Sequence, residues 1–146
     1  MHHQSLSAVV LLDGGLGQEI TRRSTRAKPH PLWSTMVMRE EPQTVVDVHR
    51  DFLMAGARVL TLNNYTATPM RLARVGMESE LAHIHHQASY LLDQAIESSG
   101  ISRSTLSKMG CLPPLAASYV ADAAPDYDSA RSQYEQLIEV QIDHVD

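Results

Sequence analysis

The sequence predicts an α/β fold in which short parallel strands alternate with helices. Apolar runs typical of buried strands occupy residues 8–13, 58–63 and 104–112, and polar or glycine residues follow each of them. Apolar residues recur at helical spacing over 42–55, 67–75, 78–98 and 128–145. Strands that alternate with helices pair in parallel through right-handed crossovers, so their carboxyl ends should share one face. Ligands bind at that face in barrels and in doubly wound sheets alike.

The first third of the chain should hold one strand, one loop and one helix. The strand at 8–13, AVVLLD, is apolar and should be buried up to Asp13, where two glycines follow. Residues 16–35 are irregular, polar and basic, and their two prolines predict a long loop. A helix should begin near Pro42, since proline suits the first helical turn, and should end at Gly56.

The rest of the chain repeats this alternation. The second strand, RVLTLN at 58–63, precedes a short helix at 67–75, which Gly76 should break. A long helix at 78–98 should end before Gly100, and the third strand at 104–112 is the weakest of the three. A loop rich in proline, alanine and aspartate at 113–126 leads to an amphipathic last helix at 128–145.

Composition narrows the class of protein. The chain has 146 residues, of which 43% are hydrophobic and 20% charged, as expected for one soluble globular domain. A net charge of -5 argues against nucleic acid as a partner, because phosphate binding requires a basic face. No apolar run approaches the roughly 20 residues of a membrane span, and no signal peptide is evident. A single cysteine excludes an internal disulfide and fits a cytoplasmic protein.

The glycines after the first strand allow three interpretations. Asp13-Gly14-Gly15-Leu16-Gly17 resembles a phosphate loop, but the spacing is not G-x-G-x-x-G and no clearly capped helix follows. A strand end that binds a substrate is the better interpretation, because it places a carboxylate beside bare backbone. A plain turn, in which glycine only supplies positive φ, stays open.

Two aromatic residues lie in a predicted loop or just after a predicted strand. Trp33 lies in Pro31-Leu32-Trp33-Ser34, and Tyr65 follows the second strand. If both strand ends share a face, the rings can flank one pocket and attract a methylated cation, which is worth about 0.5–2 kcal/mol. From spacing alone, the simpler interpretation is that each ring merely covers the mouth of the sheet.

The remaining metal-binding residue types indicate no metal site. On the predicted helix His83 and His86 share one face while His85 points elsewhere. No other ligand completes a site, so we expect a solvated helix face. Cys111 at the end of the third strand lacks a visible base or partner thiol and is expected to be a small packing residue. His49 should be a partly buried structural histidine.

Five motifs in order resemble a known family. They are Leu12-Asp13-Gly14-Gly15-Leu16-Gly17, Pro31-Leu32-Trp33-Ser34, the helix from Pro42 through His49 to Gly56, Leu60-Thr61-Leu62-Asn63-Asn64-Tyr65-Thr66-Ala67, and Gly110-Cys111-Leu112-Pro113-Pro114 with Ser118-Tyr119. Together they resemble the N-terminal part of the homocysteine S-methyltransferase family. The resemblance extends from about residue 8 to the end of the chain.

The resemblance implies a fold, a reaction and a cofactor. The family fold is a zinc-containing (β/α)8 TIM barrel, and residues 1–146 would be a partial homocysteine-binding domain of about three βα units. Its members transfer a methyl group from an onium donor, or from a folate, to homocysteine and produce methionine. Zn²⁺ holds the homocysteine sulfur as a thiolate, which is a far better nucleophile than the thiol.

The resemblance also assigns five binding residues. Asp13 and Gly14 match positions that grip the polar end of homocysteine. Trp33 and Tyr65 match aromatics on the donor side, which favours the cation–π interpretation, and Asn63 matches an asparagine of the second strand. Thr66 stands where the family commonly has glutamine, and Leu-Trp-Ser is closer to members that use S-methylmethionine than to those that use betaine.

The zinc ligands of the family have no counterpart here. The family uses three cysteines of its C-terminal half, including a Gly-Gly-Cys-Cys motif, and Cys111 matches none of them. We therefore expect neither a catalytic residue nor a metal ligand in this chain, and we expect it to be inactive alone. Open sheet edges should favour self-association. The alternative is a self-standing module that binds a small ligand or a partner without catalysis.

Overall fold

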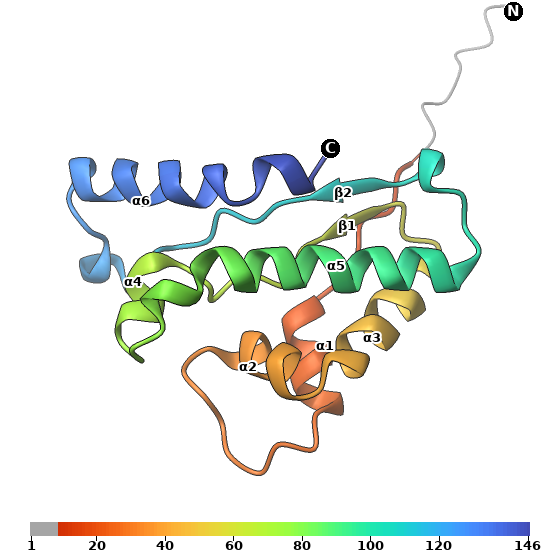
Figure 1. The fold of residues 1–146 in the computed structure, drawn as a ribbon, viewed down its shortest axis with the longest axis horizontal. Coiled ribbons are helices and arrows are strands. Elements are labelled where there is room, and N and C mark those ends of the chain that lie inside the picture. Colours follow the sequence, from red (N-terminus) through yellow and green to blue (C-terminus); the bar gives the residue numbers. More distant parts are fainter. Residues whose placement is uncertain (1–8) are drawn as a thin grey trace, which may run out of the picture.

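The computed structural model describes residues 9–146, in which a short parallel sheet lies among six α-helices (Figure 1). The first eight residues, and with them the start of the expected first strand, lie outside this range. The strands are β1 (Val59–Thr61) and β2 (Ser107–Met109). The helices are α1 (Leu16–Arg23), α2 (Trp33–Glu40), α3 (Pro42–Met54), α4 (Pro69–Ala73), α5 (Leu81–Ser99) and α6 (Tyr127–Glu139).

The parallel pairing of the second and third predicted strands is confirmed. β1 and β2 lie side by side in register, with Val59 opposite Ser107 and Thr61 opposite Met109, and α4 and α5 form the crossover between them. Both strands have only three residues and are shorter than predicted. β1 stops early because the chain turns at once, with the Asn64 amide donating a hydrogen bond to the Leu62 carbonyl.

The first predicted strand is largely wrong for the described residues. Only one parallel bridge forms, between Leu12 and Val59, and the Asp13 amide donates to the Val59 carbonyl at 2.9 Å. The side chains expected to be buried are exposed, from 51% at Leu11 to 96% at Val9. The segment hydrogen-bonds to β1 on one side, and the described residues leave its apolar side chains largely uncovered. Whether this edge pairs with another chain stays a prediction.

The predicted loop at 16–35 is a second correction, because it contains α1 and the first residues of α2, which begins at Trp33. In α1, Leu16 and Ile20 lie one helical turn apart and are both buried. Glu19 pairs with the exposed Arg22 and with the half-buried Arg23. Arg23 also pairs with Asp51 of α3, so the basic residues that indicated a loop form ion pairs within α1 and between α1 and α3. Gly15 precedes α1 without a side-chain cap, which removed the usual start signal.

The helices with proline or glycine boundaries follow the prediction closely. α3 begins at Pro42, and α5 ends at Gly100, whose φ of 71° is the left-handed conformation that glycine adopts readily. α3 packs against α5, which runs alongside the strands (Figure 1). α6 ends at Glu139, six residues before the predicted end, and Gln141 then turns inward. No helix among residues 9–146 is both long and apolar enough to cross a membrane.

Candidate functional site

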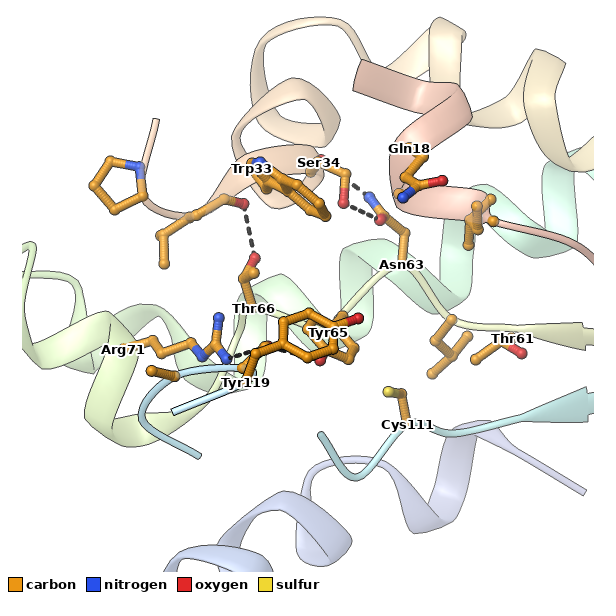
Figure 2. Close-up of a pocket in the computed structure, with 18 of the residues that line it drawn as sticks. Gln18, Trp33, Ser34, Thr61, Asn63, Tyr65, Thr66, Arg71, Cys111 and Tyr119 are labelled. Carbon is orange, nitrogen blue, oxygen red and sulfur yellow. Dashed lines mark hydrogen bonds between the residues drawn. The ribbon is translucent and has the colours of Figure 1, made fainter. Parts of the chain in front are cut away.

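A pocket of about 780 Å³ opens at the carboxyl ends of β1 and β2. The segments that follow the two strands form one side, and the starts of α1 and α2 form another (Figure 2). All five predicted binding residues line it, namely Asp13, Gly14, Trp33, Asn63 and Tyr65. The expectation that the carboxyl ends of parallel strands share one face therefore agrees with the single cavity, whereas the roles of these residues in binding stay predictions.

Asp13 joins the first segment to β1 and still faces the pocket. Its carboxylate accepts hydrogen bonds from the Thr61 amide at 2.7 Å and from the Thr61 hydroxyl at 3.1 Å. Burial raises the pKa of the Asp13 carboxyl above its ordinary value, although the bonds from Thr61 act in the opposite direction. Each carboxylate oxygen can accept a further hydrogen bond, so the group remains able to receive a ligand's ammonium.

Gly14 is required by a close approach. A Cβ at this position would lie 2.9 Å from the Phe52 ring, which is too short for a real contact. α1 begins two residues later, and the Leu16 amide donates back to the Gly14 carbonyl at 2.7 Å. The glycines thus form a tight turn that brings α1 onto α3. None of Gly14, Gly15 and Gly17 has a positive φ, so the plain-turn interpretation, in which glycine only supplies a positive φ, is wrong.

Asn63 is a buried connector between β1 and α2. Its amide nitrogen donates to the Ser34 carbonyl at 3.0 Å, and its oxygen accepts from the Ser34 hydroxyl at 2.7 Å (Figure 2). Because both ends of the side chain are engaged by one residue, Asn63 positions the start of α2. Trp33, the residue before Ser34, is held at the pocket by this pair.

Trp33 and Tyr65 present their rings to the same pocket from different segments (Figure 2). Their exposed fractions are 47% and 37%, so both rings keep free surface. Trp33 has a φ of 45°, and Tyr119 across the pocket has a φ of 64°; positive values are unfavourable for residues with a Cβ. Strained backbone of this kind concentrates at binding sites, because the surrounding structure must hold it in place.

Sequence reasoning missed the positively charged side of the pocket. Arg71 and Arg74 reach it from α4, and the Tyr65 hydroxyl and Ser118 hydroxyl pair at 2.8 Å. Thr68 caps α4 by accepting from the Arg71 amide at 3.2 Å. The Thr68-Pro69 pair is a helix-start signal, and it could have indicated that the first turn of α4 points toward the same strand end.

A buried polar network lies next to the pocket and includes His85. This histidine was expected to point away from the face that His83 and His86 share, and it is fully buried, whereas the other two are exposed. The Asn64 amide nitrogen lies 3.1 Å from His85 Nδ1 and donates to Gln141 Oε1 at 2.9 Å. His85 Nε2 lies 2.9 Å from the Ala67 carbonyl, so the neutral ring donates there and accepts from Asn64.

Gln141 extends this network to the segment after β2. Its Oε1 also accepts from the Cys111 amide at 2.9 Å, and its Nε2 donates to the Leu137 carbonyl at the same distance. A Cβ on Gly110 would lie 2.5 Å from that Oε1, so glycine is needed beside it. Cys111 itself is half-buried and lines the pocket, so it is less buried than the packing residue that was expected.

His49 is more deeply buried than predicted. It lies in α3 with no exposed surface, and neither ring nitrogen has a hydrogen-bond partner among the described residues. Burial lowers the pKa of the His49 imidazole from 6.5 to about 4, and the nearby positive charge of Lys108 adds to the shift. His49 is therefore a neutral residue of the core, and it does not line the pocket.

Comparison with known proteins agrees with the motifs. A sequence profile of the family described as Homocysteine S-methyltransferase matches residues 10–146. Homocysteine S-methyltransferase from Escherichia coli (strain K12) is 30% identical over 89 residues, which cover 61% of this chain and 26% of that protein. Selenocysteine Se-methyltransferase from Brassica oleracea var. italica is 30% identical over 95 residues, covering 65% and 25%.

The fold agrees as well. The crystal structure of the homocysteine methyltransferase MmuM from Escherichia coli, metallated form, superposes with a TM-score of 0.80 at 25% identity. The match covers 95% of this chain and 51% of that one, so the chain spans about half the length of this relative. Since the profile extends over nearly all of the sequence and the fold matches with it, the chain belongs to the homocysteine S-methyltransferase family.

Proposed function

We propose that the chain forms the substrate-binding end of a homocysteine S-methyltransferase that takes its methyl group from an onium donor such as S-methylmethionine. The observation that carries this proposal is the pocket at the carboxyl ends of β1 and β2, where Asp13 and two partly exposed aromatic rings converge. The structural match to half of a related methyltransferase supports a further proposal, that the chain is about three βα units of an eight-unit barrel.

The two substrates have complementary requirements that the pocket can satisfy. Asp13 would accept the ammonium of homocysteine, since its carboxylate already faces the cavity. Trp33 and Tyr65 would flank the positively charged onium group through their ring faces. In the proposed reaction, the homocysteine thiolate forms a bond to the methyl carbon as the bond to the donor sulfur breaks. The electron pair returns to that sulfur, so S-methylmethionine leaves as neutral methionine.

The residues described here do not fit the zinc site that the resemblance implies. Among residues 9–146, no group of three or more histidine, cysteine, aspartate or glutamate side chains is placed to hold a metal ion. Cys111 is the sole thiol, and burial raises its pKa, which disfavours the thiolate that zinc binds. We therefore propose that the chain by itself binds substrates without transferring the methyl group.

Zinc analysis tests the absence of a metal site directly. After dialysis against buffer containing zinc at micromolar concentration and then against metal-free buffer, the chain is expected to retain well under one Zn²⁺ per molecule. Elemental analysis by mass spectrometry measures this ratio. A stoichiometric, tightly held Zn²⁺ that disappears in Cys111→Ser would show that the thiol and its neighbours form a site after all.

An Asp13→Asn variant tests the homocysteine assignment. The substitution keeps the shape and an acceptor for Thr61 but removes the negative charge, so homocysteine affinity should fall about tenfold. Calorimetric titration measures the affinity, and thermal unfolding verifies that the variant is folded. Asp143→Asn, an exposed aspartate near the end of the chain, is the matched control and should bind as the parent does. Equal affinity in the parent and Asp13→Asn would remove Asp13 from the site.

A further inference from the structure

One side of the pocket carries positive charge that no acidic side chain of residues 9–146 neutralises. Arg71 Nη2 donates to the Pro114 carbonyl at 3.1 Å and to the Ser118 hydroxyl at 3.2 Å, and neither acceptor is charged. Partial burial lowers the pKa of Arg71, and the positive charge of Arg74 acts in the same direction. A partly desolvated guanidinium without a counter-ion is an attractive partner for an anion.

The guanidinium is held in place and keeps donors to spare. The hydrogen bonds from Arg71 Nη2 fix the guanidinium against the loop after β2. The guanidinium carbon, Cζ, lies 5.6 Å from the centre of the Tyr65 ring. Its Nε is buried without a partner, and its Nη1 makes no hydrogen bond to the described part of the chain. A ligand that enters the pocket can therefore bind the N–H groups of Nη1, because the Nε atom is buried, and the guanidinium need not be reordered to bind it.

The pocket is polarised along its length. In Figure 2, Arg71 lies on the opposite side from Thr61, the residue whose amide and hydroxyl hold the Asp13 carboxylate, and Tyr65 lies between them. A bare cation against Tyr65 would be repelled by the guanidinium already over that ring. A cation that carries its own carboxylate avoids this repulsion, because the carboxylate can pair with Arg71.

We propose that Arg71 is a carboxylate-binding residue that selects methyl donors in which the onium group and a carboxylate belong to the same molecule. This inference rests on the proposed function and deepens it, since it adds a specificity element to the donor side of the same pocket. Ser118, which Arg71 and Tyr65 both contact, supplies a hydroxyl beside the bound carboxylate.

The test compares two probes that differ only in the carboxylate. S-methylmethionine and its α-carboxamide have the same sulfonium and ammonium groups, and Trp33, the sole tryptophan, reports their binding by its fluorescence. The parent chain is expected to bind the acid about tenfold more tightly than the amide. In Arg71→Gln this preference should disappear through weaker binding of the acid, and Arg71→Lys should restore part of it.

Two controls separate this inference from a general loss of structure or charge. Arg131→Gln removes the same charge from the exposed face of α6 and should leave the preference intact. Homocysteine, titrated by calorimetry, should bind Arg71→Gln as it binds the parent. Equal binding of acid and amide by the parent, or an unchanged preference in Arg71→Gln, would overturn the assignment. A parent that binds homocysteine but neither probe would overturn it as well and leave the homocysteine site standing, whereas a parent that binds none of the three would refute the proposed function.

Discussion

Acidification from about pH 7.5 to about pH 4.5 is expected to lower the free energy of unfolding by about 2–3 kcal/mol through His49 alone. The folded-state pKa of this imidazole is about 4, against 6.5 in an unfolded chain. The unfolded state therefore takes up a proton that the folded state refuses. The contribution is fully present above pH 6.5 and is lost as the pH falls toward 4.

The physical reason is the surroundings of His49. The ring is fully buried in α3, and within residues 9–146 neither nitrogen has a partner, so a charged imidazolium would find no hydrogen-bond acceptor there. The Lys108 ammonium, which adds to the shift, is itself held by Asp93 at 2.7 Å and by the Ser89 hydroxyl at 2.7 Å. These contacts hold the Lys108 ammonium in its place near the ring.

His49→Leu isolates the effect. Leucine has a similar volume and no polar atoms, so the variant should be more stable than the parent at neutral pH by about 1 kcal/mol or more. Urea unfolding at a series of pH values measures the difference in free energy of unfolding between the variant and the parent. This difference should increase by about 2–3 kcal/mol on acidification from about pH 7.5 to about pH 4.5. The pKa of His85 is also lowered by burial, but its contribution is common to both proteins and cancels in the difference. His83→Leu, on an exposed turn of α5, should leave the pH dependence unchanged. A gap that stays constant with pH would show that His49 does not carry the acid sensitivity.

Gln141→Leu is expected to destabilise the fold by about 3 kcal/mol or more. The substitution removes Gln141 Oε1, the acceptor shared by the side-chain amide of Asn64 and the backbone amide of Cys111. Each buried donor left unpaired costs about 1–3 kcal/mol. Leucine is close in size to glutamine, so the loss measures hydrogen bonding rather than an empty cavity. Denaturant unfolding at neutral pH measures it.

Gln136→Leu is the matched control for that variant. Gln136 lies in α6 on the exposed face, where its side chain makes one bond of 3.3 Å to the Ser132 carbonyl. Its replacement should change the stability by less than about 0.5 kcal/mol. If the two variants were equally stable, the buried network would have no role in holding the segment after β2.

Local boundary residues explain which elements could be predicted. Pro42 and Gly100 act within their own turn, so α3 and α5 follow from the sequence. α1 could not be found in this way because Gly15 supplies no side-chain cap and the buried pair of Leu16 and Ile20 is flanked by basic residues. The strand at 8–13 looked buried because apolar runs usually are, yet burial depends on what packs against the run.

The residues of the pocket likewise divide into those that could be predicted from the sequence and those that could not. To expect that residues after parallel strands lie on one face, only their positions in the chain are needed. Asp13, Asn63 and Tyr65 were grouped in this way, and they line one cavity. Arg71 and Ser118 are 47 positions apart in the sequence, and Asn64 and Gln141 are 77 apart, so neither contact leaves a local pattern. Partners of this kind emerge only from the packing of α4 and α6 around the sheet.

The place of Cys111 makes the cavity chemically addressable. The chain has a single cysteine, and that residue lines the pocket. Because burial raises its pKa, alkylating reagents react with it slowly at neutral pH and faster in mild alkali. A covalent tag can therefore be attached at one known wall of the cavity without engineering the rest of the surface. Molecules that fill the cavity shield this thiol, so the rate of tagging reports occupancy for ligands that have no spectroscopic signal of their own.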